Sequence, residues 1–283
     1  MSSYVFVSDL FSEDYVGGAE LTTDAIIKKF SNQSDIIKIK SHEVTLNKID
    51  ELKDHHWIIC NFSNLSESNK LNICKNIQYS IIEYDYKFCK YRSIELHKIK
   101  EGIECNCKDL PSNKINLAFY GLAKKIWFMS NTQREIFFKN VKTIKQEKTE
   151  ILSSVFSDGD LRFINSIKDN EKDDKYLIVK SNSWVKGFDS CLNYAKENNL
   201  KYEVVQKLPY HELLIKLSTS KGLIFLPDGA DTCPRLVIEA KLLGCELILN
   251  DLVQHKNEDW FSDNQACLEY MSNRASNFWS YYE

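Results

Sequence analysis

One segment late in the chain constrains the fold most strongly, because it reads as strand, polar loop, helix and strand. Residues 222–226 are an apolar run that suits a buried parallel strand, and residues 246–249 are a second such run. Between them, apolar residues recur at helical spacing over 234–243. Pro234 fits the first turn of that helix, where its missing N–H costs nothing, and Gly244 supplies a stop. A unit of this kind predicts an open parallel sheet.

The same alternation of strand and helix runs through the whole chain. Further strands are expected at 4–8, 36–40, 57–62, 79–83, 126–129, 151–153, 176–180 and 202–205, and helices at 19–30, 47–53, 66–77, 131–139, 188–198 and 210–220. The 283 residues are enough for two domains of ordinary size. We therefore expect an α/β protein of two Rossmann-like domains, 1–155 and 156–283, each built on a parallel sheet.

Composition excludes some classes of protein. A net charge of −3 argues against a protein that holds nucleic acid mainly by charge. No apolar run reaches the roughly 18 to 20 residues that a membrane-spanning helix needs. The first residues lack the basic and apolar regions of a signal peptide, so a cytoplasmic protein is expected. In that compartment the nine cysteines would be reduced.

The loop 228–233 is the first candidate site. It lies at the carboxyl end of one expected strand and at the amino end of the next helix, where phosphorylated ligands bind in open α/β sheets. Asp231 and Glu239 stand eight positions apart across this loop and helix. This spacing resembles the paired acids of retaining glycosyltransferases of the GT-B fold, of the family 4 or group 1 type, with Asp in place of the first Glu.

The resemblance implies two sheets facing across a cleft, with the nucleotide-sugar donor on the second domain. Glu239 would then hold the ribose hydroxyls, and Asp231 would lie beside the sugar as a catalytic acid. Thr232 and Arg235 would join the donor site. Enzymes of this fold often end in a helix that crosses back to the first domain, and the aromatic-rich C-terminal tail suits such a helix. It could equally cap the second sheet.

Two other loops resemble donor-binding elements of the same enzymes. Gly17 and Gly18 open the first helix, where a glycine pair lets backbone N–H groups approach a phosphate. Ser183, Lys186 and Gly187 follow the first strand of the second domain. The lysine would neutralise the diphosphate, because cleavage of the sugar–phosphate bond builds negative charge on the leaving group. A second cation usual in the family is absent from this loop, and Arg235 or Lys180 would have to replace it.

Asp85 ends a strand of the first domain and is followed closely by Lys87 and Arg92. The resemblance places acceptor or sugar contacts in this region, so Asp85 is a candidate catalytic group. A buried ion pair is the alternative interpretation of the same residues.

Cys89, His97, Cys105 and Cys107 are four soft ligands in an irregular polar segment, 88–116. Thiolates and an imidazole suit tetrahedral zinc, although the spacing matches no common zinc finger. A loop of this length in a compact domain needs something to hold it. A structural zinc, reduced thiols and a disulfide all remain open.

The expected function is sugar transfer from a nucleoside diphosphate sugar to an acceptor, with retention at the anomeric carbon and no catalytic metal ion. Glycan, lipid-linked sugar, protein and modified DNA base are all possible acceptors. The alternatives are a binding module for nucleotide sugars without turnover, and a nucleotide-sugar isomerase on the same fold.

Overall fold

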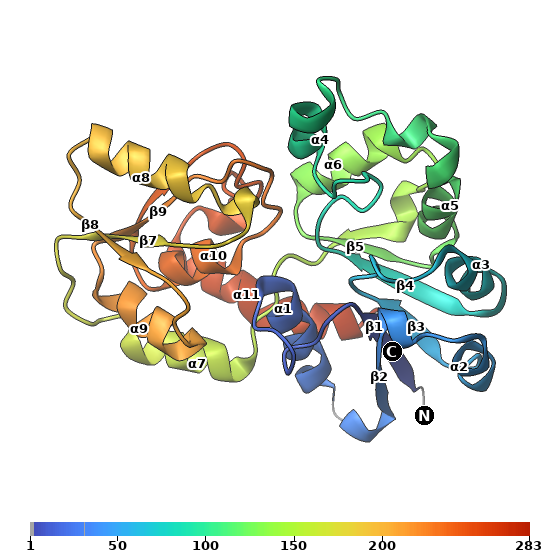
Figure 1. Cartoon of the computed structure of the whole chain (residues 1–283). Coiled ribbons are helices and arrows are strands. Elements are labelled where there is room, and N and C mark those ends of the chain that lie inside the picture. Colours follow the sequence, from blue (N-terminus) through green and yellow to red (C-terminus); the bar gives the residue numbers. More distant parts are fainter. Residues whose placement is uncertain (1–2, 31) are drawn as a thin grey trace. The chain divides into compact units, whose positions relative to one another are not determined.

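The computed structural model describes residues 3–30 and 32–283. The chain divides into two compact units, residues 1–153 and 154–283, beside the expected boundary between 155 and 156. Each unit contains one parallel sheet, and the sheets have six and four strands (Figure 1).

The first unit is built on a sheet with the strand order β2-β1-β3-β4-β5-β6. The strands are β1 Tyr4–Ser8, β2 Ile36–Lys40, β3 His56–Ile59, β4 Gln78–Glu83, β5 Ile126–Phe128 and β6 Thr149–Ile151. The helices are α1 Gly18–Lys29, α2 Leu46–Glu51, α3 Glu67–Asn76, α4 Ile94–Glu101, α5 Lys114–Leu122 and α6 Asn131–Asn140. All neighbouring strands run parallel, and the order reverses between β1 and β3.

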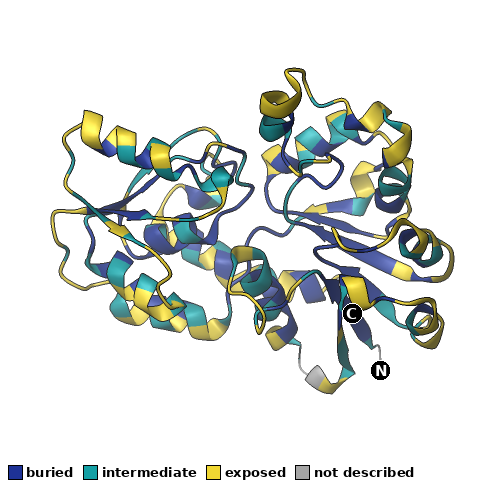
Figure 2. Ribbon diagram, viewed as in Figure 1, coloured by how far each residue is buried: buried dark blue, intermediate teal, exposed yellow. Residues whose placement is uncertain are grey.

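The central strands β1, β3 and β4 are buried along most of their length, because both faces of the sheet are covered. Val5, Phe6, Val7, Trp57 and Ile58 have no exposed surface. In Figure 2 the strands of this sheet are accordingly drawn mostly in dark blue. Continuous rather than alternating burial is typical of parallel strands. The helix α3 packs against α2 and α5.

The second unit is built on a sheet with the order β10-β9-β7-β8, again with all strands parallel. The strands are β7 Tyr176–Val179, β8 Tyr202–Val205, β9 Gly222–Phe225 and β10 Glu246–Leu249. The helices are α7 Asp158–Ile167, α8 Phe188–Glu197, α9 Tyr210–Thr219, α10 Arg235–Leu242 and α11 Asn264–Trp279. Here the strand order reverses between β7 and β9.

A reversal of strand order defines where a ligand can bind. Chain connections leave in opposite directions from the two strands at such a point, so a crevice opens outside their carboxyl ends. The relevant loops are those that follow β1 and β3 in the first unit, and β7 and β9 in the second. The sequence-based α/β class with parallel sheets is therefore confirmed, and the strand order adds the position of each crevice.

Some expectations from the sequence are wrong. Pro234 precedes α10 as its N-cap with ψ 117°, and does not lie in the first turn. The segment 88–116 is not an irregular loop, because it contains α4, which Ser93 caps by accepting from Leu96 N at 3.1 Å. The expected strand 151–153 ends earlier, at Ile151, and Ser153 adopts a positive φ of 63°.

Three other helices are α5, α7 and α11. α5 was not expected, and neither was α7, whose capping box joins Ser157 and Asp160. The helix expected near the C-terminus is α11, which packs on α7 and α10.

Gly187 is a position where the fold requires glycine. It adopts φ 60° at the start of α8, and a Cβ there would lie 1.9 Å from the carbonyl oxygen of Leu226, just after β9. The loops after β7 and β9 are therefore packed backbone to backbone, at the reversal of strand order.

We predict that Gly187→Ala lowers the free energy of unfolding by at least about 3 kcal/mol, because left-handed strain of about 1–2 kcal/mol adds to displacement of the Leu226 backbone. Gly244→Ala is the matched control in the same unit. Gly244 has φ 71°, but its nearest neighbour is the flexible Lys172 side chain at 4.0 Å, so only the strain applies. Urea unfolding of both variants measures the difference, and equal losses would contradict the close-packing argument.

Candidate donor and acceptor sites

The loops after β7 and β9 bring an ion pair to the crevice of the second unit. Lys186 Nζ lies 2.5 Å from Asp231 Oδ2, although the two residues are 45 positions apart. The loops are also joined by the hydrogen bond from Asp228 N to Val185 O, at 3.0 Å. Two residues that the sequence assigned to the diphosphate and to the sugar are thus direct neighbours.

The two residues of this ion pair differ in how freely their side chains can move. The Asp231 backbone is fixed, because its N–H donates to Leu252 O at 2.8 Å and its carbonyl accepts from Gln254 N at 3.1 Å. Its side chain is 12% exposed, whereas that of Lys186 is 37% exposed. Lys186 is therefore the member that can move to an incoming anion.

Glu239 lies on α10 in a buried polar group with Tyr210 and Arg235. Tyr210 donates its hydroxyl proton to Glu239 Oε1 at 2.8 Å, and Arg235 Nε lies 3.4 Å from the same oxygen. Burial raises the pKa of Glu239, and Arg235 and Tyr210 oppose that rise. Within the described part of the chain, Oε2 accepts no hydrogen bond, so one carboxylate oxygen is held and the other is available.

Arg235 has surroundings that differ from those of a cation exposed to a ligand. Its side chain is 3% exposed, and its guanidinium stacks on Phe156 at 3.9 Å. Nη1 donates to Val155 O, while Nη2 donates to Tyr210 Oη at 3.0 Å and lies 3.4 Å from Asp160. The donors of Arg235 thus serve the protein, and its contact with Glu239 orients that carboxylate.

The other predicted donor residues lie in the same loops. Gly187 is buried against Leu226, and Thr232 is 6% exposed. Ser183 is exposed and precedes the short 3-10 turn Trp184–Lys186. Lys180 is exposed at the end of β7 and is the second cation close to this loop in sequence.

The predicted glycine pair lies in the first unit, at the amino end of α1. Gly17 is the N-cap and Gly18 is the first helical residue. Among the described residues, no side chain caps this helix end. A Cβ on Gly17 would lie 2.5 Å from Glu20 Oε2 and 2.6 Å from the Tyr15 ring. The Glu20 carboxylate therefore lies beside this end of the helix, where it accepts a hydrogen bond from its own backbone N–H.

The crevice of the first unit is lined by polar groups that follow β1 and β3. Asp9 accepts hydrogen bonds from the backbone N–H groups of Ser63 and Asn64, both at 3.0 Å. Arg92 reaches the same place and donates to Ser63 Oγ at 2.9 Å. The sequence analysis predicted no role for Asp9 or Ser63, because only the order of the strands makes these two residues neighbours.

Asp85 lies between two cations beside this crevice. Lys87 Nζ is 3.1 Å from one carboxylate oxygen, and Arg92 Nε donates to the other at 2.8 Å. Burial favours the neutral acid, but Lys87 and Arg92 outweigh it and hold the pKa of Asp85 below its ordinary value. The ion pair considered as an alternative is present, and Asp85 is a carboxylate at neutral pH.

Glu83 is a buried acid that the sequence analysis did not single out. It has no exposed surface, and it accepts from Lys87 Nζ at 2.9 Å and from the Tyr120 hydroxyl. Burial raises the pKa of Glu83 to about 7, although Lys87 opposes the rise. The signal available in the sequence was an acid at the end of an apolar strand.

The four predicted metal ligands lie close together in the first unit. One ligand atom from each of Cys89, His97, Cys105 and Cys107 lies within 4.8 Å of all the others. None of the nine cysteines forms a disulfide in the described part of the chain.

One hollow on the surface of the second unit lies apart from the predicted site residues. This hollow on α7, α10 and α11, lined by Leu161, Ile164 and Leu242, contains none of the predicted site residues. Among the described residues, no helix is both long and apolar enough to cross a membrane.

Comparison with solved structures identifies the fold. Neither a model of a protein family nor a curated protein sequence matches the chain. The structure, in contrast, matches solved glycosyltransferases of the GT-B fold over nearly its whole length. The chain therefore has the GT-B fold of two Rossmann-like domains.

Three solved structures illustrate the match. E. coli trehalose-6-phosphate synthase bound with UDP-2-fluoro glucose has a TM-score of 0.61 at 10% identity, over 96% of this chain and 91% of that one. The UDP-forming trehalose-phosphate synthase of Burkholderia xenovorans has 0.57 at 10%, over 98% and 96%. Anabaena HepE, in complex with UDP and glucose, has 0.55 at 10%, over 99% and 95%.

We predict that Glu83 makes the stability of the first unit depend on pH. Its pKa is about 7 in the folded protein against an ordinary value of 4.5. The folded state therefore binds the proton more tightly, and this contribution is complete below pH 4.5 and is lost as the pH rises to about 7. Asp85 titrates below this window, because its pKa is lowered from 3.8.

Urea unfolding of the wild type and Glu83→Gln across this range measures the effect. The advantage of the wild type over the variant should shrink as the pH rises and then level off. Exposed Glu51→Gln is the control and should give a profile parallel to the wild type. Parallel profiles for Glu83→Gln as well would show that Glu83 keeps its ordinary pKa.

Proposed function

We propose that this protein is a glycosyltransferase that takes a sugar from a nucleoside diphosphate donor bound to the second unit. The observation that carries the proposal is the group of charges at the crevice after β7 and β9. Lys186 and Asp231 lie in contact there, and Glu239 lies on the helix that follows. The fold shared with solved glycosyltransferases supports the same conclusion.

The diphosphate would bind at the Lys186 loop. The N-cap residues of α8 and α10 are Gly187 and Pro234, which have no side chain that can cap the helix, so the amino ends of both helices can donate to phosphate oxygens. Lys186 would exchange Asp231 for the diphosphate and stabilise the charge of the leaving group. Lys180 would add the second cation, because Arg235 is buried.

The ribose would bind at Glu239. Tyr210 and Arg235 fix one oxygen of this carboxylate, which orients the other as an acceptor for ribose hydroxyls. Asp231 would then lie beside the sugar once Lys186 has moved to the diphosphate. Thr232 and Ser183 would supply further polar contacts. Retention of the anomeric configuration follows from the resemblance of these acids to those of retaining enzymes.

The acceptor would bind to the first unit at the polar edge formed by Asp9, Asp85 and Arg92. Asp85 is ionised at neutral pH, so it would accept a hydrogen bond from an acceptor hydroxyl group. The glycine pair at the start of α1 would offer backbone donors to a polar group of the acceptor, beside the Glu20 carboxylate. A screen of glycan, lipid-linked, protein and modified DNA acceptors tests this assignment by transfer of labelled sugar.

We predict that Glu239→Gln weakens donor binding about 10- to 100-fold, because a hydrogen bond to a charged group contributes roughly 1.5–3 kcal/mol. Thermal shift with a panel of nucleoside diphosphates and their sugars identifies the ligand in the wild type. Titration of that ligand into the variant then measures the loss. Lys196→Ala, an exposed residue of α8, is the control and should bind as the wild type does.

Lys186→Ala separates the diphosphate contact from the ribose contact. This variant should lose more affinity for a nucleoside diphosphate than for the matching monophosphate, whereas Glu239→Gln should lose affinity for both. A wild type that no donor stabilises would contradict the proposal. Binding without release of nucleoside diphosphate in any acceptor screen would leave only a nucleotide-sugar-binding module.

A further inference from the structure

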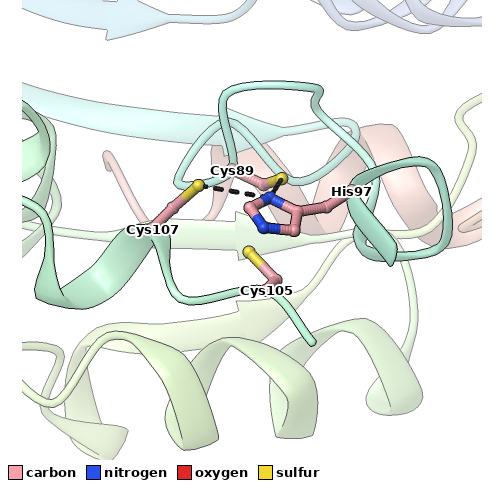
Figure 3. A group of neighbouring side chains, drawn as sticks. All are labelled: Cys89, His97, Cys105 and Cys107. Atoms are coloured by element: carbon pink, nitrogen blue, oxygen red, sulfur yellow. Dashed lines mark hydrogen bonds between the residues drawn. The ribbon is translucent and has the colours of Figure 1, made fainter. Parts of the chain in front are cut away.

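A cluster of metal-ligating side chains lies outside the sites described above. Cys89 follows β4, His97 lies in α4, and Cys105 and Cys107 follow that helix. Figure 3 shows the imidazole ring of His97 lying among the three sulfur atoms. The intervening α4 turns the chain back, so that residues up to 18 positions apart converge on one point.

The distances within the cluster suit a tetrahedral ion. His97 Nδ1 lies 3.7 Å from Cys89 Sγ and 3.5 Å from Cys107 Sγ. Ligands at the usual zinc distances of about 2.3 Å for sulfur and 2.0–2.1 Å for nitrogen lie about 3.6 Å apart at the tetrahedral angle. Hydrogen bonds between a thiol and an imidazole have similar lengths. The number and the burial of the ligands must therefore distinguish a metal site from a group of hydrogen-bonded side chains.

Burial makes this cluster unfavourable without a further partner. Cys89 and Cys107 are each 2% exposed, and His97 is 1% exposed. His97 Nε2 is buried and has no hydrogen-bond partner among the described residues. An ion bound at Nδ1 leaves Nε2 as it is, but it would give the buried thiolates and the imidazole a strong common partner.

One backbone N–H supports a thiolate at this place, whereas Cys89 Sγ donates to Ser93 O at 3.3 Å as a thiol. Lys90 N–H donates to Cys107 Sγ at 3.5 Å, which is the kind of hydrogen bond that stabilises a metal-bound thiolate. The side chain of Asn113 donates to the carbonyl oxygens of Phe88 at 2.6 Å and of Cys107 at 3.0 Å. Both ends of the segment are thus held around the four ligands.

We propose that Cys89, His97, Cys105 and Cys107 bind one zinc ion that stabilises the segment between β4 and α5. Three thiolates and one imidazole complete a tetrahedral site with no open position, which is typical of structural and not catalytic zinc. Binding would release the three thiol protons to solvent.

The zinc ion would also hold part of the acceptor edge in place. Arg92 lies between Cys89 and His97 in the sequence and adopts a positive φ of 56°. Its guanidinium donates to Asp85 and to Ser63. A zinc ion that fixes both flanking ligands would therefore fix the segment from which Arg92 reaches the carboxyl ends of β3 and β4.

Metal analysis of the full chain, purified without chelator, tests the proposal. We expect one zinc per chain, and refolding in cobalt should give the visible absorption of a tetrahedral thiolate complex. Removal of zinc by a chelator should lower the melting temperature, and zinc added back should restore it. These measurements use the wild type, so they do not depend on the folding of a variant.

Paired variants locate the site. Cys105→Ala should lose the zinc, whereas Cys74→Ala, which replaces a similarly half-buried cysteine outside the cluster, should keep it. Circular dichroism checks that both variants fold. Metal content far below one equivalent, with no cobalt spectrum and no thermal response to zinc, would overturn the proposal. A disulfide within the cluster, detected by intact mass without reductant, would also overturn it.

Discussion

The close approach of two loops in the second unit is the constraint on which the candidate donor site depends. Gly187 and Leu226 touch through their backbones, with no room for a side chain on the first. This contact brings the loop after β7 against the loop after β9, and Lys186 thereby reaches Asp231. The glycine also begins α8 in a left-handed conformation, which leaves the amino end of that helix without a side chain over it. The absence of a side chain on Gly187 thus allows both the ion pair between Lys186 and Asp231 and the uncovered amino end of α8.

Buried charged residues form one network in each unit. In the second unit, Arg235 connects the start of α10 to Val155, Tyr210 and Asp160, and it orients Glu239 in doing so. In the first unit, Lys87 lies between Glu83 and Asp85. Removing one partner from such a network leaves a charge buried without compensation, at a cost of about 3–5 kcal/mol. These networks hold the carboxyl groups at the strand ends, where burial raises the pKa of Glu83 while Lys87 and Arg92 lower the pKa of Asp85.

The candidate sites were predictable to different degrees. The sequence placed Lys186 and Asp231 in loops that follow strands and Glu239 on the helix after the second loop, because apolar runs and loop composition reveal those elements. It also grouped the four soft ligands, since they lie close together in the chain. It gave no sign that Lys186 contacts Asp231, or that Arg235 is buried, because both depend on residues many positions away. Glu83, Asp9 and Tyr210 were missed for the same reason.

The sequence by itself determined where the strands lie and that the sheets are parallel, because short apolar runs alternating with helical patterns are a local property of the chain. It failed for α4, which lies in the segment judged irregular, and for α5 and α7, where no element was predicted. The order of the strands was decided only by the tertiary structure, since it depends on which apolar faces pack together across the whole unit. That order places the reversals beside β1 and β7, and so determines which polar loop residues become neighbours.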